Sequence, residues 1–352
     1  MKQRIIGFDL ARAYAIFGMF IVNFNTVFGN AKDESFLGQF LTLFSGNSST
    51  VFVMLAGMGV ALMSNRIEEY GSEERWYLRF TLIKRAAFLF FFGLLFSLWW
   101  PADILHLYGC YILIASAILF LDKKNLLVIA AITIIVFHVI LLFIPYERGW
   151  NLDTLTYPDL WTFKGFLRNT FYNGWNPIFP WFSYFAIGMF LGRLNWSNTT
   201  LYKKIVVTGA SLYIIIEVIQ YVIQNTSADP QVIEFFTADY IPPFLPFILS
   251  TTGFGLIIIG VFMLLGEHFA NKQWTINLAK TGQMTLTHYV LHLTAGILLI
   301  SLWQGENAEW SSPLFVLLFS LLFFVANFYF SLYWTKKYKR GPLESLMRKI
   351  AD

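Results

Sequence analysis

The amino-acid sequence predicts an all-α integral membrane protein, a polytopic bundle of about ten transmembrane helices in a single domain over residues 1–352. Three observations lead to this fold class. Hydrophobic residues make up 57% of the chain and charged residues 13%, whereas soluble domains contain about 45–50% and about 25%. Aromatic residues reach 19%, with 38 Phe, and long apolar runs recur along the whole chain. A soluble globular protein and a disordered chain are therefore excluded.

The apolar runs have the length of about 20 residues that a helix needs to cross the hydrocarbon core of a bilayer. A backbone in lipid must satisfy its own hydrogen bonds, and the runs lack the alternation of β-barrel strands, so each is expected to be a helix. We expect spans near residues 8–28, 47–64, 82–100, 104–121, 125–144, 178–193, 205–224, 244–266, 278–302 and 313–335.

Lysine and arginine are unevenly distributed between the two sides of these spans. With ten spans and the N-terminus inside, only Lys32, Arg148, Lys164 and Arg168 of the 25 basic residues fall in outer segments. Cytoplasmic loops of membrane proteins carry the excess of basic residues. We therefore expect a multi-pass protein of the bacterial cytoplasmic (inner) membrane, with both termini in the cytoplasm and segments 145–177 and 225–243 outside.

Small residues at helical spacing indicate faces where helices pack closely. Gly188 and Gly192 form a GxxxG pattern in one span, and Gly57 with Ala61 forms a similar pair in another. Such pairs let two backbones approach within a membrane. We expect both pairs to serve packing rather than catalysis.

Polar side chains at membrane depth are few, and several come in pairs on one helix face. Asp103 and His106 are three residues apart at the outer start of one span, and His288 and His292 are four apart in another. Asn23 lies at the outer end of the first span. At about 1.5 Å per residue these groups share one outer layer. Because polar groups are costly in lipid, we expect His292, His106 and Asn23 around one cavity.

Each of these pairs also has a purely structural interpretation. The His288–His292 pair fits a satisfied polar face inside a bundle, and the Asp103–His106 pair fits local helix capping. Two histidines four apart can hold a metal, but no HExxH pattern and no third ligand are evident. The single cysteine, Cys110, lies in an apolar run and excludes a cysteine cluster. No metal site is predicted.

Other ionisable residues in the spans have simple structural explanations beside a functional one. Asp9 and Arg12 are three apart and fit an ion pair within the first helix, near the inner face. His138 and Glu217 each fit a lone polar residue that faces a neighbouring helix.

Segments along the whole chain resemble the YeiB-like membrane proteins and the relatives of heparan-α-glucosaminide N-acetyltransferase. The opening RIIGFDLAR at 4–12 and the apolar run that follows it to Asn23 resemble their first helix. DILHLYG at 103–109 and FPW at 179–181 resemble two further segments. The most specific matches are GQMTLTHY at 282–289 and GPLE at 341–344.

The resemblance implies a transmembrane acyltransferase that moves an acyl group, typically acetyl from acetyl-CoA, to a sugar or glycan across the membrane. This sequence departs from the family pattern at several positions. The best-known branches carry a histidine near the outer end of the first span, where Asn23 and Asn25 stand here. Position 288 is often Asn in relatives, and Gln283 replaces a common Arg.

The implied chemistry assigns roles to the polar layer. Acyl transfer needs a general base and a donor for the developing oxyanion, and an imidazole suits the base near neutral pH. We expect His292 as the base and His106 as the second candidate, with His288 beside them. Asp103 would orient a histidine, and Asn23 would donate to the oxyanion.

Acyl-CoA, with acetyl-CoA as the typical donor, is the co-substrate that the resemblance implies. Its phosphates need cationic partners on the cytoplasmic side. We expect them from Arg79, Lys84, Arg85, Lys203 and Lys204, although these residues also fit the positive-inside rule alone.

The expected partners are membrane lipid and a small-molecule or glycan acceptor. A homo-oligomer is compatible with the sequence, and no nucleic-acid partner is expected. The alternative function is a non-catalytic transporter of a small polar solute, although no inverted repeat is evident. A lipid-associated scaffold fits less well, because it would not need buried His and Asp. Acyl-CoA turnover separates these classes.

Overall fold

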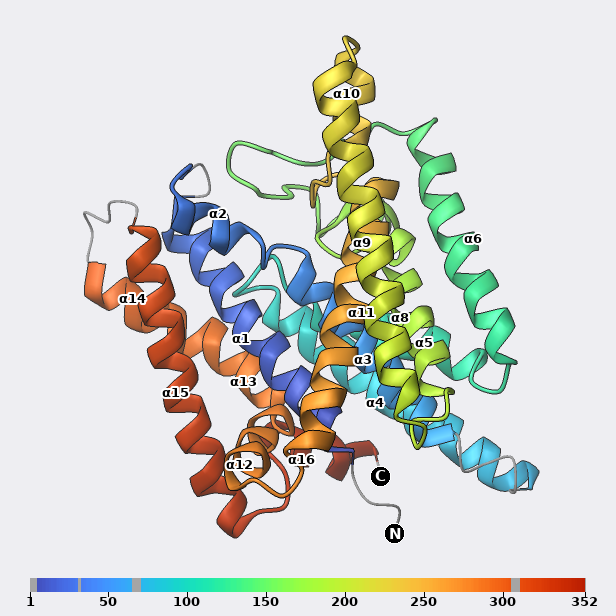
Figure 1. The fold of residues 1–352 in the computed structure, drawn as a ribbon, viewed down its shortest axis with the longest axis vertical. Helices are drawn as coiled ribbons and strands as arrows, with labels where there is room; N and C mark the ends of the chain where they lie inside the picture. The colour runs from blue at the N-terminus through green and yellow to red at the C-terminus, as the bar shows by residue number, and fades with distance from the viewer. Residues whose placement is uncertain (1–4, 31–32, 65–70, 305–310, 352) are drawn as a thin grey trace. The chain divides into compact units, whose positions relative to one another are not determined.

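The computed structural model describes residues 5–30, 33–64, 71–304 and 311–351, and all regular secondary structure in these ranges is helical (Figure 1). The helices are α1 (Ile6–Phe28), α2 (Phe36–Thr42), α3 (Asn47–Ser64), α4 (Ser72–Phe96), α5 (Leu105–Ala117), α6 (Lys123–Leu141), α7 (Phe163–Arg168), the π-helix η1 (Asn169–Asn173), α8 (Ile178–Gly192), α9 (Thr200–Thr226), α10 (Pro230–Phe236), α11 (Leu245–His268), α12 (Gln273–Gly282), α13 (Thr285–Leu291), the π-helix η2 (His292–Gly296), α14 (Ile297–Gln304), α15 (Pro313–Lys337) and α16 (Pro342–Ala351).

Within the described ranges, seven helical stretches are long and apolar enough to cross a membrane. They are Ile6–Phe28, Phe36–Ser64, Lys123–Leu141, Thr200–Thr226, Leu245–His268, Thr285–Gln304 and Pro313–Lys337. Each of the ten predicted spans overlaps at least one helix, so the prediction of a polytopic helical membrane protein is confirmed.

Three predicted spans differ from this simple pattern. The span near 82–100 overlaps α4, which begins ten residues earlier, at Ser72, and ends at Phe96; its first turn contains Glu73 and Glu74. The spans near 104–121 and 178–193 correspond to α5 and α8, which have only 13 and 15 residues. A count of apolar residues therefore locates these helices but not their ends.

The predicted span 278–302 is corrected by the structure. α12 ends at Gly282, Met284 has non-helical backbone angles (φ −119°, ψ 32°), and a new helix begins at Thr285. The membrane candidate therefore begins seven residues later than predicted, at Thr285.

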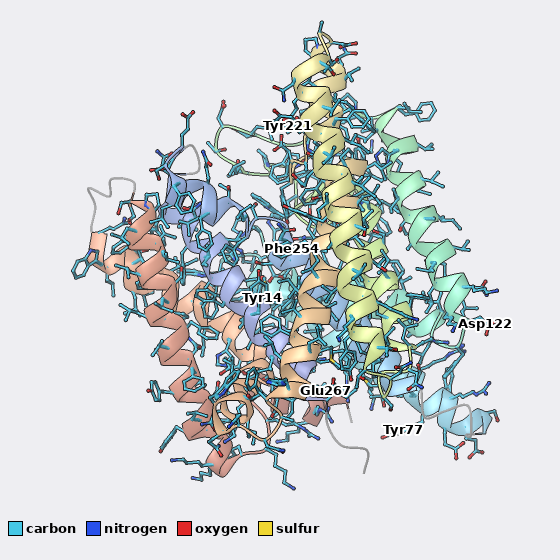
Figure 2. All side chains as sticks on the ribbon, in the orientation of Figure 1. Tyr14, Tyr77, Asp122, Tyr221, Phe254 and Glu267 are labelled. Carbon is cyan, nitrogen blue, oxygen red and sulfur yellow. The ribbon has the colours of Figure 1, made fainter. Side chains whose placement is uncertain are left out.

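The surface is apolar in the way expected of a protein surrounded by lipid. Leu95, Leu322 and Trp303 are 70%, 67% and 79% exposed. Figure 2 shows the aromatic rings of Tyr77 and Tyr221, which are 62% and 70% exposed. Large apolar side chains in contact with water would be unfavourable over so wide a surface, whereas lipid accepts them. The protein is a multi-pass membrane protein.

The basic residues that decide the orientation are only partly within the described ranges. Lys2, Arg4, Lys32 and Arg66 lie outside the described residues. The inside location of both termini stays a prediction.

The chain divides into two compact units, each built from separate stretches of sequence. Unit 1 contains residues 1–52, 196–213 and 251–346. In it α1 packs against α12, α13 and α15 (Figure 1). Rings of Phe20 and Phe24 on α1 meet Phe323 and Phe319 on α15, with centroids 5.2 and 5.0 Å apart. These apolar contacts make the core in which the polar side chains of this unit are held.

Unit 2 contains residues 53–195, 214–250 and 347–352. In it α4 packs against α5, and α8 packs against α5 and α6. The predicted packing role of the small residues is confirmed. A Cβ at Gly57 or at Gly188 would collide with the facing backbone, and one at Gly192 would lie 2.8 Å from the Cβ of Ala61. α3 and α8 thus approach closely along these residues.

Candidate functional site

The segment that joins α12 to α13 lies at the polar centre of unit 1. Gly282 packs so closely on α1 that a Cβ would collide with the backbone oxygen of Asp9. The next residue, Gln283, donates from Nε2 to Asp9 Oδ2 at 3.1 Å. Arg12 donates to Asp9 Oδ1 at 2.9 Å, so the predicted Asp9–Arg12 ion pair is confirmed. The buried carboxylate of Asp9, which is 2% exposed, therefore connects the non-helical segment between α12 and α13 to the first helix.

His292 and Asn23 are in direct contact, although 269 positions separate them. Nδ2 of Asn23 lies 2.9 Å from Nε2 of His292, and Nδ1 of His292 lies 3.3 Å from the backbone oxygen of His288. A carbonyl oxygen can only accept, so Nδ1 carries the proton and Nε2 accepts from the Asn23 amide. The ring is 0% exposed and lies 5.0 Å from the ring of Phe20 and 5.3 Å from that of Tyr289.

His288 is also enclosed, by α15. Its Nδ1 lies 2.7 Å from Oδ1 of Asn327, and its Nε2 lies 2.8 Å from Oγ of Ser331. Nδ2 of Asn327 donates to the backbone of Phe323, which directs its Oδ1 toward the ring. With the proton on Nδ1, His288 donates to Asn327, and its Nε2 faces the Ser331 hydroxyl, whose one proton also serves the backbone oxygen of Asn327 at 2.8 Å.

His288 and His292 therefore each have both ring nitrogens within hydrogen-bond distance of a protein group. Neither His288 nor His292 presents a free lone pair to a substrate in this arrangement. Their contacts match the interpretation as a satisfied polar face, and they fix α13 against α1 and α15.

Two of the most specific sequence motifs meet in unit 1. The hydroxyl of Thr287 donates to Glu344 Oε2 at 2.6 Å, and its backbone N–H donates to Oε1 at 3.1 Å. The N–H of Leu343 in turn donates to the Thr287 hydroxyl at 3.2 Å. Burial raises the pKa of the Glu344 carboxyl above its ordinary value, and the bonds from Thr287 partly oppose that shift. GQMTLTHY and GPLE are thus parts of one hydrogen-bonded contact.

Asp103 and His106 form the polar pair of unit 2, at the start of α5. Asp103 Oδ2 accepts the N–H groups of Leu105 and His106 at 2.9 and 3.3 Å, which is the predicted capping. The same oxygen lies 3.4 Å from Nδ1 of His106. A carboxylate acts as the acceptor here, so it selects the tautomer with the proton on Nδ1 and leaves Nε2 as an acceptor.

Nε2 of His106 differs from the ring nitrogens of His288 and His292. It is buried, and it has no hydrogen-bond partner among the residues that the structure describes. Asp103 and His106 are 1% and 4% exposed. A buried imidazole held by a carboxylate, with its second nitrogen unpaired, has the arrangement of a general base awaiting a proton.

Gly93 on α4 makes this arrangement possible. A Cβ at this position would lie 2.8 Å from Oδ2 of Asp103 and from Cα of His106, and it would collide with the His106 nitrogen. Only a glycine lets α4 approach the start of α5 so closely.

A cluster of amide and aromatic side chains lies elsewhere in unit 2, and it includes Tyr111 from the same helix as His106. Tyr111 donates to the backbone oxygen of Asn176 at 2.6 Å, and Tyr240 donates to its Oδ1 at 3.1 Å. The ring of Trp181 lies 5.3 Å from that of Tyr240. Asn176 Nδ2 and Trp181 Nε1 are buried donors for which the described part of the chain supplies no acceptor. These two donors fit a ligand that carries oxygen acceptors.

The three residues predicted to surround one cavity belong to different units. Asn23 and His292 belong to unit 1, and His106 belongs to unit 2. The structure brings Asn23 to His292 and Asp103 to His106, and a common cavity for all three helices stays a prediction.

The five expected phosphate-binding residues also divide between the units. Lys203 and Lys204 are exposed on α9, in unit 1, whereas Arg79, Lys84 and Arg85 are on α4, in unit 2.

The three residues on α4 have neighbours of their own. The guanidinium of Arg79 lies 5.0 Å from the centre of the Phe120 ring, and Nζ of Lys84 lies 5.3 Å from that of Phe80. Arg85 is buried, with Nη1 3.5 Å from the sulfur of Met63. Among these three, Arg79 and Lys84 retain more exposure for an anion than Arg85 does.

Residues 4–226, more than half of the chain, match the family described as heparan-alpha-glucosaminide N-acetyltransferase, catalytic. The chain belongs to this family. Residues 189–352 match a second family, described as a protein of unknown function (DUF418). The resemblance that the motifs indicated is confirmed. No curated protein matches the chain.

The acetyltransferase match and the DUF418 match cover different candidate residues. Asn23, Asp103 and His106 fall within the heparan-alpha-glucosaminide N-acetyltransferase match, whereas His288 and His292 fall only within the DUF418 match. The match whose description names a catalytic activity thus contains the Asp103–His106 pair.

Several partners of the polar groups were missed by sequence reasoning. Asn327 and Ser331 hold His288, and their spacing of four in an apolar span was the available signal. Glu217, expected as a lone polar residue, accepts from Ser250 on α11 at 2.8 Å, so it does face a neighbouring helix. Trp181 lies in a motif that was recognised for its resemblance alone.

Proposed function

We propose that this protein is a membrane acyltransferase that moves an acyl group, acetyl in the first instance, from cytosolic acyl-CoA to a sugar, glycan or other polar acceptor at the outer face. The chain belongs to a family of membrane acetyltransferases. The observation that carries the proposal is Nε2 of His106, which is buried, unpaired among the described residues and backed by Asp103.

In this proposal His106 is the general base and Asp103 orients it. His292 was the first expectation for the base, but its Nε2 accepts from Asn23 and its Nδ1 faces a carbonyl. A base must have a lone pair that can reach the proton it removes. The contacts therefore favour His106, and His288 and His292 are proposed to position α13 instead.

The proposed step is balanced within the two substrates. His106 Nε2 takes the proton of the acceptor hydroxyl or amine while that atom attacks the thioester carbonyl carbon. The bond from the acceptor to the acyl carbon forms, the C–S bond breaks, and His106 returns the proton to the leaving thiolate. Free CoA thiol and acylated acceptor are the products.

The buried donors Asn176 Nδ2 and Trp181 Nε1 support a polar acceptor in unit 2, since each lacks a protein acceptor in the described ranges. For the acyl donor, Arg79 and Lys84 of unit 2 are the basic residues proposed to bind CoA phosphates. Lys and Arg bind phosphate through charge-assisted hydrogen bonds, which exposed side chains can form without loss of packing.

The test is release of free CoA thiol by purified protein in lipid nanodiscs, with acylated products identified by mass spectrometry. His106→Asn keeps a side-chain N–H for Asp103 but has no counterpart of Nε2. Removal of a general base costs about 10²–10⁴ in rate, so this variant should lose most turnover and still bind acyl-CoA. His268→Asn, on an exposed histidine at the end of α11, is the matched control.

Wild-type protein that neither binds nor turns over any acyl-CoA would contradict the proposal and favour a transporter. Full turnover by His106→Asn would reject His106 as the base while leaving acyl transfer in place. The acyl-CoA binding measurement distinguishes the two outcomes, because binding is absent in the first and present in the second.

A further inference from the structure

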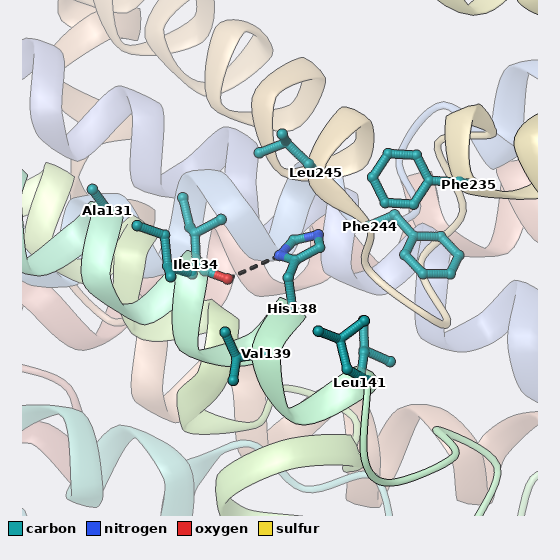
Figure 3. A pocket seen from close by; sticks show the side chains of 10 residues that line it. Ala131, Ile134, His138, Val139, Leu141, Phe235, Phe244 and Leu245 are labelled. Carbon is teal, nitrogen blue, oxygen red and sulfur yellow. Dashed lines mark hydrogen bonds between the residues drawn. The ribbon is translucent and has the colours of Figure 1, made fainter.

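An open apolar groove lies in unit 2, between α6 and the chain around the start of α11. Its volume is about 700 Å³, which is the size of a ligand pocket. Side chains of α6 form one wall, and Phe235, Phe244 and Leu245 form the other (Figure 3). Every lining side chain except that of His138 is apolar.

The groove opens on a surface that is expected to face lipid. Ile135 and Val139 on α6 and Leu142, directly after it, line the groove and are 60%, 46% and 79% exposed. α6 is itself long and apolar enough to span the membrane. A hydrocarbon chain is therefore the occupant that fits the walls, because it makes apolar contact without leaving polar groups unpaired.

His138 places one polar atom in these apolar surroundings. Its Nδ1 lies 2.9 Å from the backbone oxygen of Ile134, one turn earlier, as Figure 3 shows. Since a carbonyl only accepts, Nδ1 carries the proton and Nε2 is an acceptor. Nε2 is buried and has no partner among the described residues. The ring lies 6.2 Å from that of Phe235, across the groove.

The position of His138 along α6 indicates where the ligand must be polar. The helix has 19 residues, which corresponds to about 28 Å, close to the thickness of the hydrocarbon core. His138 lies in its last turn. An acceptor at this depth meets the part of a lipid where the chain joins the polar group.

We propose that this groove binds a membrane lipid with a free hydroxyl at the polar end of its hydrocarbon chain, the hydroxyl donating to Nε2 of His138. The chain satisfies the apolar walls, and the hydroxyl satisfies the one acceptor that they leave unpaired. This site is separate from the acyl-transfer proposal and does not depend on it.

The experiment uses the full chain in nanodiscs and a pair of photoreactive probes, a C16 alcohol with a mid-chain diazirine and its methyl ether. The two probes share the chain and the oxygen, and they differ in that a methyl group replaces the hydroxyl proton in the ether. The alcohol should label peptides from 123–142 and 230–250 at least several-fold more than the ether does.

Three variants separate the polar contact from the apolar one. His138→Phe keeps a ring of similar size but has no acceptor, so the alcohol and ether should label equally. Ala131→Trp fills the groove and should reduce labelling by both probes. Ile132→Trp, on the same helix, 50% exposed and outside the groove, should behave as wild type.

Equal labelling by the two probes in wild-type protein, or a preference for the alcohol that persists in His138→Phe, would overturn the proposal. Labelling that avoids both groove peptides would do the same. If His138→Phe fails to fold, competition on wild-type protein decides. Unlabelled hexadecanol should displace the alcohol probe, and its methyl ether should displace it several-fold less, whereas equal displacement would reject the hydroxyl contact.

Discussion

The close approach of α4 to the start of α5 predicts that one added methyl group would disturb the Asp103–His106 pair without changing either residue. In Gly93→Ala the new Cβ would lie 2.8 Å from Asp103 Oδ2, whereas ordinary contact begins at 3.4 Å. The Asp103 contact alone requires a movement of about 0.6 Å, the difference between these two distances, and the closer contact with the His106 backbone nitrogen requires more.

Movement of this size has a calculable consequence for catalysis. A misplacement of about 1 Å costs about 10²-fold in rate, so Gly93→Ala should lower kcat of thiol release about 10- to 100-fold. Overpacking also costs about 1–3 kcal/mol of stability, and the assay therefore runs well below the unfolding temperature of the variant.

The matched control is Gly71→Ala, at the residue that precedes the first turn of α4. Among the described residues, a Cβ at Gly71 would meet only the flexible carboxylate end of Glu74, at 3.1 Å. This control should keep the wild-type kcat. A folded Gly93→Ala protein with wild-type kcat would refute the reasoning, because it would show that the placement of Asp103 and His106 does not matter for turnover.

Three further predictions concern stability and topology. Thr287→Val removes the hydroxyl that donates to Glu344 and should lower the free energy of unfolding by about 1–3 kcal/mol, measured by thermal unfolding in detergent; Thr287→Ser should restore it. Burial raises the pKa of Glu344 above its ordinary 4.5, so the protonated carboxyl contributes stability below pH 4.5, and this contribution is lost as the pH rises through the folded-state pKa. The free energy of unfolding, measured from pH 4 to 8, should therefore depend less on pH in Glu344→Gln than in the wild type. An unchanged slope would show that Glu344 does not cause the pH dependence. In a Cys110→Ser background, an impermeant maleimide applied to whole cells should label the Asp153→Cys protein but not the Asn198→Cys protein. The reverse result would invert the topology.

The helices were largely predictable because the signal for a membrane span is local. Apolar runs located α6 and α15 to within a few residues, since burial in lipid imposes a minimum length on the sequence itself. The start of α4 was missed because its first turns are charged and carry no apolar run. The break at Met284 was missed because it depends on contacts of Gly282 and Gln283 with Asp9, far away in the sequence.

The candidate site was predictable in its residues but not in its pairings. Helical spacing suggested that Asp103 and His106 share a face, and they are in contact. Depth in the membrane suggested that Asn23 and His292 belong to one layer, and they also are in contact.

Spacing cannot tell which nitrogen of a histidine is already bonded. The choice between His292 and His106 therefore required the positions of Asn23 and of the His288 carbonyl. The same limit hid Asn327 and Ser331, whose partner lies on another helix.

The central claim is that His106, rather than His292, removes the proton during acyl transfer, and a single-turnover rate at saturating acyl-CoA tests it most directly. His292→Gln keeps an acceptor for the Asn23 amide and should retain most of the wild-type rate. His106→Asn should slow the same step by about 10²–10⁴-fold without loss of acyl-CoA binding. A wild-type single-turnover rate in His106→Asn, or a larger loss in folded His292→Gln than in His106→Asn, would contradict the account.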